Sequence, residues 1–236
     1  MELTMNHTCL FRIMLASVAL GALTSFAQTV GKVFLLNGNA VSFTEANPKE
    51  TKVVQNSPVQ SKDILRTEDK ANLEIGFLDA TSCKLGPSTE LSIEEYRFVR
   101  DQQNSAFKAT LKKGKATFST GKMVTDNPEN FKITTPSATI GVRGCLFDLN
   151  QEESDRLVIT VLEVGKTNGP SIFVKTLSGV KYEFSAAGFV IIQNNQIIFS
   201  GPAIPPSRPI APMQLNNIQV NRVIQLDKPP SSHQPY

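Results

Sequence analysis

Short apolar and β-branched runs, separated by Gly, Asn and Pro, follow one another from about residue 30 to residue 200. Several of them alternate apolar and polar residues, as half-buried strands do. No convincing helical period occurs after the first 27 residues. The pattern therefore predicts an all-β fold, a single domain of many short strands over residues 28–200. It leaves open whether these strands form a sandwich or a solenoid-like stack.

Two glycine turns are each predicted to close a hairpin. Asn37-Gly38 divides the apolar run 30–43, and Lys113-Gly114 divides the run 107–118. Asn-Gly between alternating runs is a strong hairpin signal, because both turn residues must accept a positive φ. The β-branched run 157–162 is dense enough to predict a buried strand.

Residues 93–103 are the most polar of the strand-like segments. Glu94 and Glu95 lie beside Arg97 and Arg100. An acid/base pair is one interpretation of the two glutamates. A solvated edge strand, whose charges discourage pairing with other chains, is the interpretation we favour.

The two ends of the chain differ in composition from the domain between them. Residues 1–27 combine Arg12, a short apolar run and small residues up to Ala27, which is typical of a cleaved secretory signal peptide; a retained N-terminal anchor helix is the alternative. Residues 201–236 are Pro-rich and are expected to be an extended or partly disordered tail. Within this tail, residues 213–226 are apolar enough to dock on something, although their periodicity does not distinguish helix from strand. We therefore expect an exported protein, periplasmic or extracellular, without a membrane span after cleavage.

Composition excludes several kinds of chemistry. The only two histidines, His7 and His233, lie in the predicted leader and tail, so the domain lacks imidazole for Ser-His-Asp, Cys-His or most zinc sites. No phosphate-binding loop, dinucleotide fingerprint, CxxC pair or acidic calcium loop is present, and no cofactor or metal is expected. The formal charge of +3 is too small and too dispersed for nucleic-acid binding.

Five lysines and two cysteines suggest two further features. Residues 108–122 contain a local excess of positive charge, which could attract an anionic glycan or lipid head groups; a solvated face is the simpler interpretation. The lysines are Lys108, Lys112, Lys113, Lys115 and Lys122. Removal of the leader leaves Cys83 and Cys145, a pair that suggests a disulfide in an exported protein, although two buried free thiols would also fit.

Residues 134–149, TTPSATIGVRGCLFDL, form the most distinctive stretch of the chain. Pro136 is predicted to mark a strand edge, and Gly141 and Gly144 suit a tight bend around Val142-Arg143. The Arg143 guanidinium offers five donors in a planar fork. It is expected either to fix a corner of the fold or to form an anion or partner site.

This stretch resembles the signature TP-x-A-x-x-G-V-R-G-T-x-F-x-V of FecR-type domains, with Cys145 in place of Thr. The matching residues are Thr135, Pro136, Ala138, Gly141, Val142, Arg143, Gly144 and Phe147. Residues 63–67, 78–81 and 85–91 resemble further family elements. Lys62 and Ala80 stand where the family has glycine, which puts the geometry of those two turns in doubt.

The resemblance implies a role in cell-surface signalling at the bacterial envelope, or a stand-alone exported protein. Our first hypothesis is a non-catalytic exported module that binds a protein partner or an envelope glycan, with strand addition at an exposed edge as the mode for a protein. The alternative is a structural envelope protein tethered through its Pro-rich tail. An enzyme using carboxylates such as Asp148, Glu152 and Glu163 is the least favoured hypothesis; it requires two carboxylates that converge in a cleft.

Overall fold

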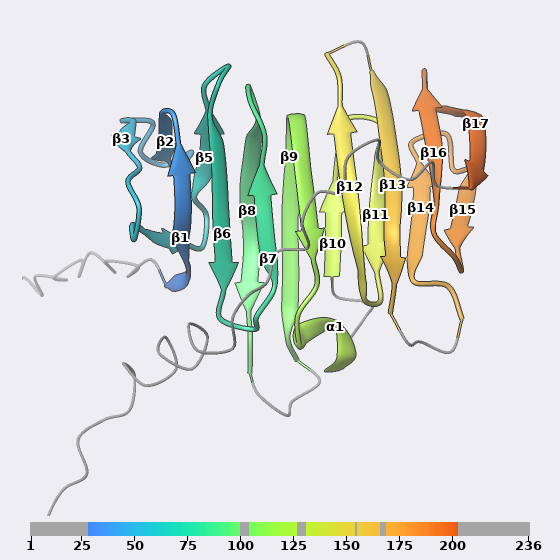
Figure 1. Cartoon of the computed structure of the whole chain (residues 1–236), viewed down its shortest axis with the longest axis horizontal. Coiled ribbons are helices and arrows are strands. Elements are labelled where there is room, and N and C mark those ends of the chain that lie inside the picture. The colour runs from blue at the N-terminus through green and yellow to red at the C-terminus, as the bar shows by residue number, and fades with distance from the viewer. Residues whose placement is uncertain (1–27, 100–103, 127–130, 154, 166–168, 203–236) are drawn as a thin grey trace, which may run out of the picture.

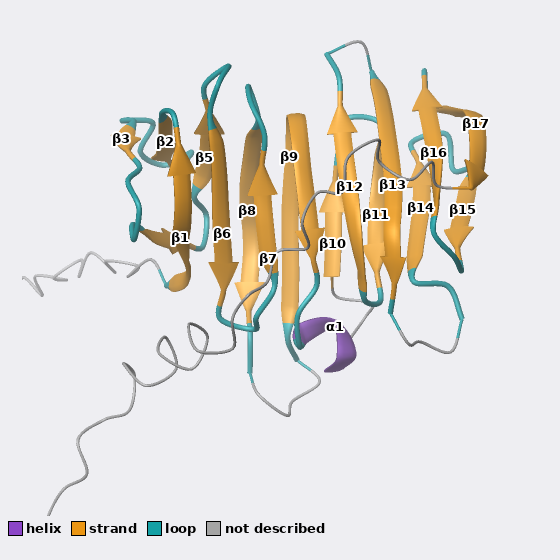
Figure 2. Cartoon of the chain, in the orientation of Figure 1, coloured by secondary structure: helices purple, strands orange, loops and turns teal. Residues whose placement is uncertain are grey.

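The computed structural model describes residues 28–99, 104–126, 131–153, 155–165 and 169–202. The predicted leader, the Pro-rich tail and the apolar segment 213–226 lie outside these residues. Strands dominate the described part, and α1 (Met123–Asp126) is a single short turn of helix (Figure 2). No helix within the described residues is long and apolar enough to cross a membrane. The all-β prediction is confirmed.

The strands form two sheets. Sheet A contains, in spatial order, β4 (Pro58–Gln60), β1 (Thr29–Asn37), β6 (Asn72–Phe77), β7 (Ser82–Leu85), β9 (Ala106–Ser119), β12 (Cys145–Gln151), β13 (Arg156–Val164), β16 (Gly188–Gln193) and β17 (Gln196–Pro202). Sheet B contains β3 (Thr51–Lys52), β2 (Ala40–Phe43), β5 (Ile64–Thr67), β8 (Glu90–Arg97), β9, β10 (Phe131–Thr134), β11 (Ala138–Val142), β14 (Ile172–Thr176) and β15 (Lys181–Phe184). Because β9 belongs to both, the hydrogen-bonded ladder is continuous between the sheets.

The chain builds both sheets together from one end of the molecule to the other. After β9 it adds the hairpin β10–β11 to sheet B, β12–β13 to sheet A, β14–β15 to sheet B and β16–β17 to sheet A. Figure 1 shows this progression as a colour gradient across the molecule. The two arrangements left open by the sequence are thus combined: the layers are those of a sandwich, and the chain advances as it does in a solenoid.

Gly114 allows one long strand to serve both sheets. Residues 106–113 of β9 pair with β8 in sheet B, and residues 114–119 pair with β12 in sheet A. Gly114 has a φ of +91°, and a Cβ there would lie 2.3 Å from Thr89 Oγ1. The predicted hairpin at Lys113-Gly114 is therefore wrong: the glycine bends a continuous strand from one sheet into the other.

The predicted hairpin at Asn37-Gly38 is wrong for a similar reason. β1 pairs with β4 and β6, whereas β2 pairs with β3 and β5, so the two strands that flank the turn lie in different sheets. Gly38 has a φ of +85°, and its missing Cβ leaves room for Ala71. The turn carries the chain across the sandwich because both strands find partners elsewhere.

Aromatic side chains join the two sheets into one core. Phe77 of sheet A stacks on Tyr96 of sheet B with ring centroids 5.5 Å apart, and meets Phe107 edge-on at 5.3 Å. Phe118 and Phe147, register partners on β9 and β12, stack at 5.4 Å. These contacts fall within a single cluster of buried residues, so the described strands share one hydrophobic interior.

The polar segment that begins at residue 93 pairs with a strand on one side. β5 pairs with residues 90–92 of β8, whereas residues 94–97 pair only with β9 among the described residues, and Ile93 and Tyr96 of β8 are buried. Its charges point outward, where Glu95 pairs with Lys108 at 2.6 Å. Residues 94–97 thus fit the predicted edge strand, and an ion pair to the neighbouring strand stabilises their charged outer face.

The two residues that stand where the family has glycine, Lys62 and Ala80, both have a positive φ. Lys62 has a φ of +76° and Ala80 a φ of +68°. Ala80 closes the turn between β6 and β7, where its N–H donates to the Phe77 carbonyl at 3.1 Å. The turns thus keep the left-handed geometry at a cost of about 1–2 kcal/mol each for a side chain at positive φ.

Candidate functional site

The distinctive stretch 134–149 lies inside the domain, at a crossing between the sheets. β11 ends at Val142 in sheet B and β12 begins at Cys145 in sheet A. Gly144, at the crossing, has a φ of +114°. Its carbonyl accepts a hydrogen bond from Gly165 at 2.8 Å, and a Cβ on Gly165 would lie 2.6 Å from that oxygen.

The residues singled out in this stretch lie at the crossing or on the strands that lead to it and from it. Val142 and Phe147 have no exposed surface, and Pro136 is exposed in the turn between β10 and β11. The Arg143 N–H donates to the Ser171 carbonyl at 2.7 Å, and its guanidinium carbon lies 4.7 Å from the centroid of the Phe173 ring. The two interpretations of Arg143, a structural corner and an anion or partner site, both stay predictions. Gly141 faces Phe173 on the neighbouring strand without a close contact.

Cys83 and Cys145 are free, buried thiols, so the structure does not form the predicted disulfide. They lie on β7 and β12, which pair with opposite sides of β9. Two strand spacings, about 9.6 Å, already exceed the separation of about 7 Å that a disulfide tolerates between Cα atoms. Burial raises the pKa of Cys145 to about 12 and raises that of Cys83 as well. These thiols act as small apolar side chains.

The lysines of residues 108–122 do not form one positive surface. Lys108 and Lys112 lie on the part of β9 that belongs to sheet B, whereas Lys115 lies on the part in sheet A. Lys108 pairs with Glu95 at 2.6 Å, Lys112 with Glu90 at 3.2 Å and Lys113 with Glu153 at 3.2 Å. The solvated-face interpretation fits this arrangement better than a site for an anionic polymer.

The three carboxylates considered for an enzyme do not converge. Asp148 and Glu163 lie on neighbouring strands, but Glu163 is opposite Leu146 and exposed. Glu152 follows the end of β12 and pairs with Arg156 at 2.7 Å. It lies four positions after Asp148, about 13 Å along an extended chain. No cluster of metal-ligating side chains occurs among the described residues.

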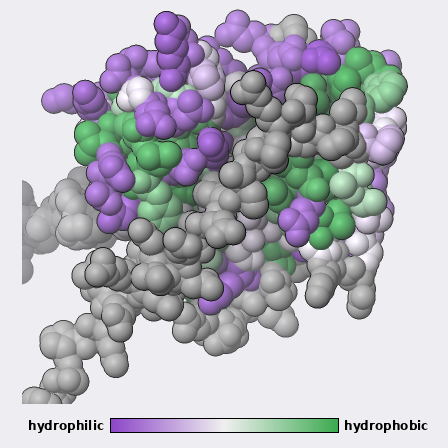
Figure 3. Space-filling model, in the orientation of Figure 1, coloured by the Kyte–Doolittle hydropathy of each residue, from purple (hydrophilic) through white to green (hydrophobic). Residues whose placement is uncertain are grey.

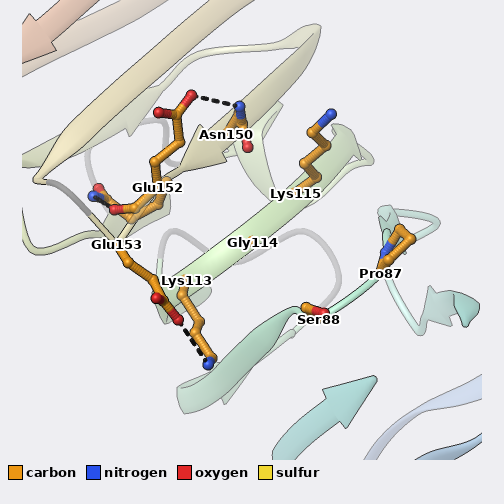
Figure 4. Close-up of a pocket in the computed structure, with 9 residues that line it drawn as sticks. Pro87, Ser88, Lys113, Gly114, Lys115, Asn150, Glu152 and Glu153 are labelled. Carbon is orange, nitrogen blue, oxygen red and sulfur yellow. Dashed lines mark hydrogen bonds and ion pairs between the residues drawn. The ribbon is translucent and has the colours of Figure 1, made fainter. Parts of the chain in front are cut away.

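A groove of about 490 Å³ lies where β9 bends, between the turn at Pro87-Ser88, residues 113–115 and residues 150–153 (Figure 4). Among its charged groups, Lys113 pairs with Glu153 and Glu152 pairs with Arg156, and Lys115 also lines the groove. Asn150 also donates to Glu152 Oε1 at 3.4 Å.

The four edge strands of the two sheets differ in how they are protected. β3 has two residues, and β4 has three and begins with Pro58. β15 carries Lys181 and Glu183. β17, with seven residues and no charged side chain, pairs only with β16 among the described residues, and its Ile198 and Phe199 are 55% and 54% exposed. Short length, Pro and charge are devices that block pairing with other chains, and β17 lacks them apart from a terminal Pro202 and a bulge near Ile198.

The outer face of sheet A carries apolar side chains next to this edge. One row across the sheet reads Lys115, Asn150, Val158, Ile191, Phe199. In the next row Thr160 lies opposite Phe189, whose ring stacks on that of Phe199 at 5.3 Å. We call Val158, Phe189, Ile191 and Phe199 the outer patch. Figure 3 shows apolar surface at the end of the molecule where β16 and β17 lie.

Comparison with known proteins identifies the central part of the chain. Residues 63–165 match the family model described as FecR protein. This part of the chain is similar to FecR proteins. The match confirms the resemblance that residues 134–149 predicted. It ends after β13, so β14 to β17, which supply three of the four outer-patch residues and the open edge, follow the matched FecR residues.

Two solved structures are weakly similar to this chain. Two crystal structures of a provisionally assigned anti-sigma factor from Parabacteroides distasonis, at 1.65 and 2.50 Å resolution, are 15% identical to this chain, with TM-scores of 0.45 and 0.46. Each alignment covers 59% of this chain and 59% of the other, so the chain spans about three fifths of the length of that protein. No curated protein matches the sequence.

The open edge and the outer patch were not singled out from the sequence, although a signal was present. In residues 157–162 (LVITVL) both alternating positions are apolar or β-branched, which predicts burial on both faces. Leu157, Ile159 and Val161 point into the core, whereas Val158 and Thr160 lie on the outer face and are only partly covered. Apolar residues on the outer face as well as the inner face of this strand indicate a surface that another segment could cover.

Proposed function

We propose that this protein is an exported, non-catalytic regulatory module of the bacterial envelope, which binds a protein partner by accepting a strand along β17. The FecR match supports a role in regulation rather than catalysis. The observation that carries the mode of binding is the β17 edge, the long and uncharged member of the four described edges.

Strand addition uses the main chain for affinity and alternate side chains for specificity. A partner strand beside β17 would satisfy the outward N–H and C=O groups of residues 196–202. Its side chains on the outer face would lie next to Phe199, and Ile198 would contribute additional apolar surface. A partner with a short, uncharged, β-branched segment fits this edge.

Two matched variants test the proposal. Ile198→Lys places a charge on the β17 edge, and Leu177→Lys places the same charge on an equally exposed apolar residue, 63% exposed, in the β14–β15 turn. Envelope proteins crosslinked to wild type and to each variant in cells would be quantified by mass spectrometry. The partner is defined as the species that both wild type and Leu177→Lys capture.

Ile198→Lys is expected to reduce capture of that partner by about tenfold or more, the change given by 1.4 kcal/mol of binding free energy. Circular dichroism of the purified variant would confirm that it folds. Equal capture by the two variants, or capture by neither wild type nor Leu177→Lys, would overturn strand addition at β17.

A further inference from the structure

The outer patch is apolar surface that the described residues leave partly exposed. Val158, Ile191 and Phe199 are direct register partners on β13, β16 and β17, so their side chains form one continuous row. They are partly exposed and are not among the hydrophobic residues that pack against the core cluster. Apolar patches of this kind usually mark an interaction surface.

A carboxylate lies at the margin of the patch. Asp148 on β12 is opposite Thr160, which is in turn opposite Phe189. Its Oδ1 is buried and has no hydrogen-bond partner among the described residues. Burial raises the pKa of Asp148, against a hydrogen bond from Thr117 and the charge of Lys115. A cation placed over the patch would therefore find an acceptor.

The chain after β17 carries a segment of matching chemistry. In Ile218–Leu226 the residues Ile218, Val220, Ile224 and Leu226 fall on one side of an extended chain, with Arg222 between them. Gln219, Asn221 and Gln225 fall on the other side, together with Val223. Arg222 is the single charged residue of the apolar segment 213–226.

We propose that residues 218–226 of the same chain lie across the outer patch, with their four alternating apolar side chains on Val158, Phe189 and Ile191 and with Arg222 paired to Asp148. In this arrangement residues 218–226 pack on the face of β13 and β16 and not along the free edge of β17. This inference is therefore independent of strand addition at that edge.

The chain is long enough to make this connection. Residues 203–217 separate the end of β17 from Ile218 and include Pro205, Pro206, Pro209 and Pro212. An extended Pro-rich spacer of this length reaches about 46 Å. The distance from β17 to β12 across three strand spacings is about 14 Å, so the segment can return over sheet A without strain.

Photocrosslinking in the purified full chain tests the contact. p-Benzoylphenylalanine would replace Thr160, which lies beside the patch opposite Phe189, and in a second protein would replace Thr139, a partly exposed threonine on the outer face of sheet B. We expect crosslinks from position 160 to peptides containing residues 218–226, about tenfold more abundant than those from position 139. Mixing heavy-isotope and unlabelled chains separates crosslinks within one chain from those between copies.

The ion pair between Arg222 and Asp148 is tested in the protein that carries p-benzoylphenylalanine at position 160. Arg222→Asp should reduce the crosslink from position 160, and adding Asp148→Arg should restore it. Crosslinks only between copies, equal yields from positions 160 and 139, or no product containing residues 218–226 would each overturn the proposal. Circular dichroism of every variant would exclude loss of folding as the cause.

Discussion

The two outer faces of the sandwich have different chemistry although one strand, β9, contributes to both. Across sheet B, one row reads Ser92, Thr110, Thr134, Thr139, Lys175, Lys181. The equivalent row of sheet A reads Lys115, Asn150, Val158, Ile191, Phe199. This row of sheet B is polar from β8 to β15 and continues at its other end into Ile64 and Phe43, whereas the row of sheet A becomes apolar as it approaches β17.

This difference shows which part of the surface has to be explained by an interaction. The side chains of a polar outer row are stabilised by hydration, and sheet B adds ion pairs such as that of Lys108 with Glu95. An apolar outer row loses free energy in water, at about 25 cal/mol for each Å² left exposed. The contrast places the candidate interaction surface at the C-terminal end of sheet A and away from the distinctive stretch 134–149.

The largest expected effect on stability comes from crowding the bend in β9, the strand that both sheets share. Gly114→Ala would place a Cβ against Thr89 at a φ of +91°. We expect a loss of about 3 kcal/mol in the free energy of unfolding, from overpacking and the left-handed backbone together. Urea denaturation would measure it. Gly179→Ala is the control, because Gly179 has a φ of +88° and no neighbour within 4 Å; equal losses in the two variants would contradict the steric account.

The faces themselves can be compared with one substitution made twice. Ile191→Thr lies in the outer patch, and Ile64→Thr lies on the outer face of sheet B, opposite Ser92 and in the same class of partial exposure. If the outer patch is covered, Ile191→Thr should cost about 1–2 kcal/mol, since it buries a hydroxyl and loses apolar contact. Ile64→Thr should cost roughly 0.5 kcal/mol. Equal values by chemical denaturation would indicate that both faces are open to water.

A change in sheet A away from its outer face should raise the free energy of unfolding instead of lowering it. Ala80→Gly removes a side chain from a turn with a φ of +68°. It should stabilise the protein by about 1 kcal/mol, the cost of left-handed backbone less the extra entropy of glycine in the unfolded chain. Differential scanning calorimetry would show a higher Tm. A lower Tm would mean that Ala80 makes contacts worth more than its backbone strain.

The smallest effect is expected on the polar face. A hydrogen bond from Lys108 holds the pKa of Glu95 below its ordinary value of 4.5. The stabilisation that the Glu95–Lys108 pair gives the folded protein is therefore fully present above pH 4.5. It is lost as the pH falls through the lower pKa that Glu95 has in the folded state. Because the pair is solvent-exposed, Glu95→Gln should cost only a few tenths of a kcal/mol at pH 7. Denaturation curves at pH 7 and below pH 4 would measure this difference, and a cost that persists in acid would contradict the ion-pair origin.

The sequence was a good guide where a feature depends on neighbouring residues. The strand runs 172–176, 181–184, 189–192 and 197–199 all correspond to strands, because alternation along the chain reflects the two faces of a sheet. It also located the glycines at 38, 114 and 144, all of which have a positive φ. It could not show that Cys83 and Cys145 lie on opposite sides of β9, since strand order depends on pairings distant in sequence.

The sequence by itself determined the all-β class, the positions of the turns and the FecR resemblance, because each follows from short-range pattern and residue type. Only the tertiary structure decided what each turn does. Gly38, Gly114 and Gly144 carry the chain between sheets instead of closing hairpins, since a positive φ permits a reversal but does not choose the partner strand. Likewise, an apolar residue on β13 or β16 becomes core or surface according to which face the other sheet covers, and that is fixed by packing across the whole sandwich.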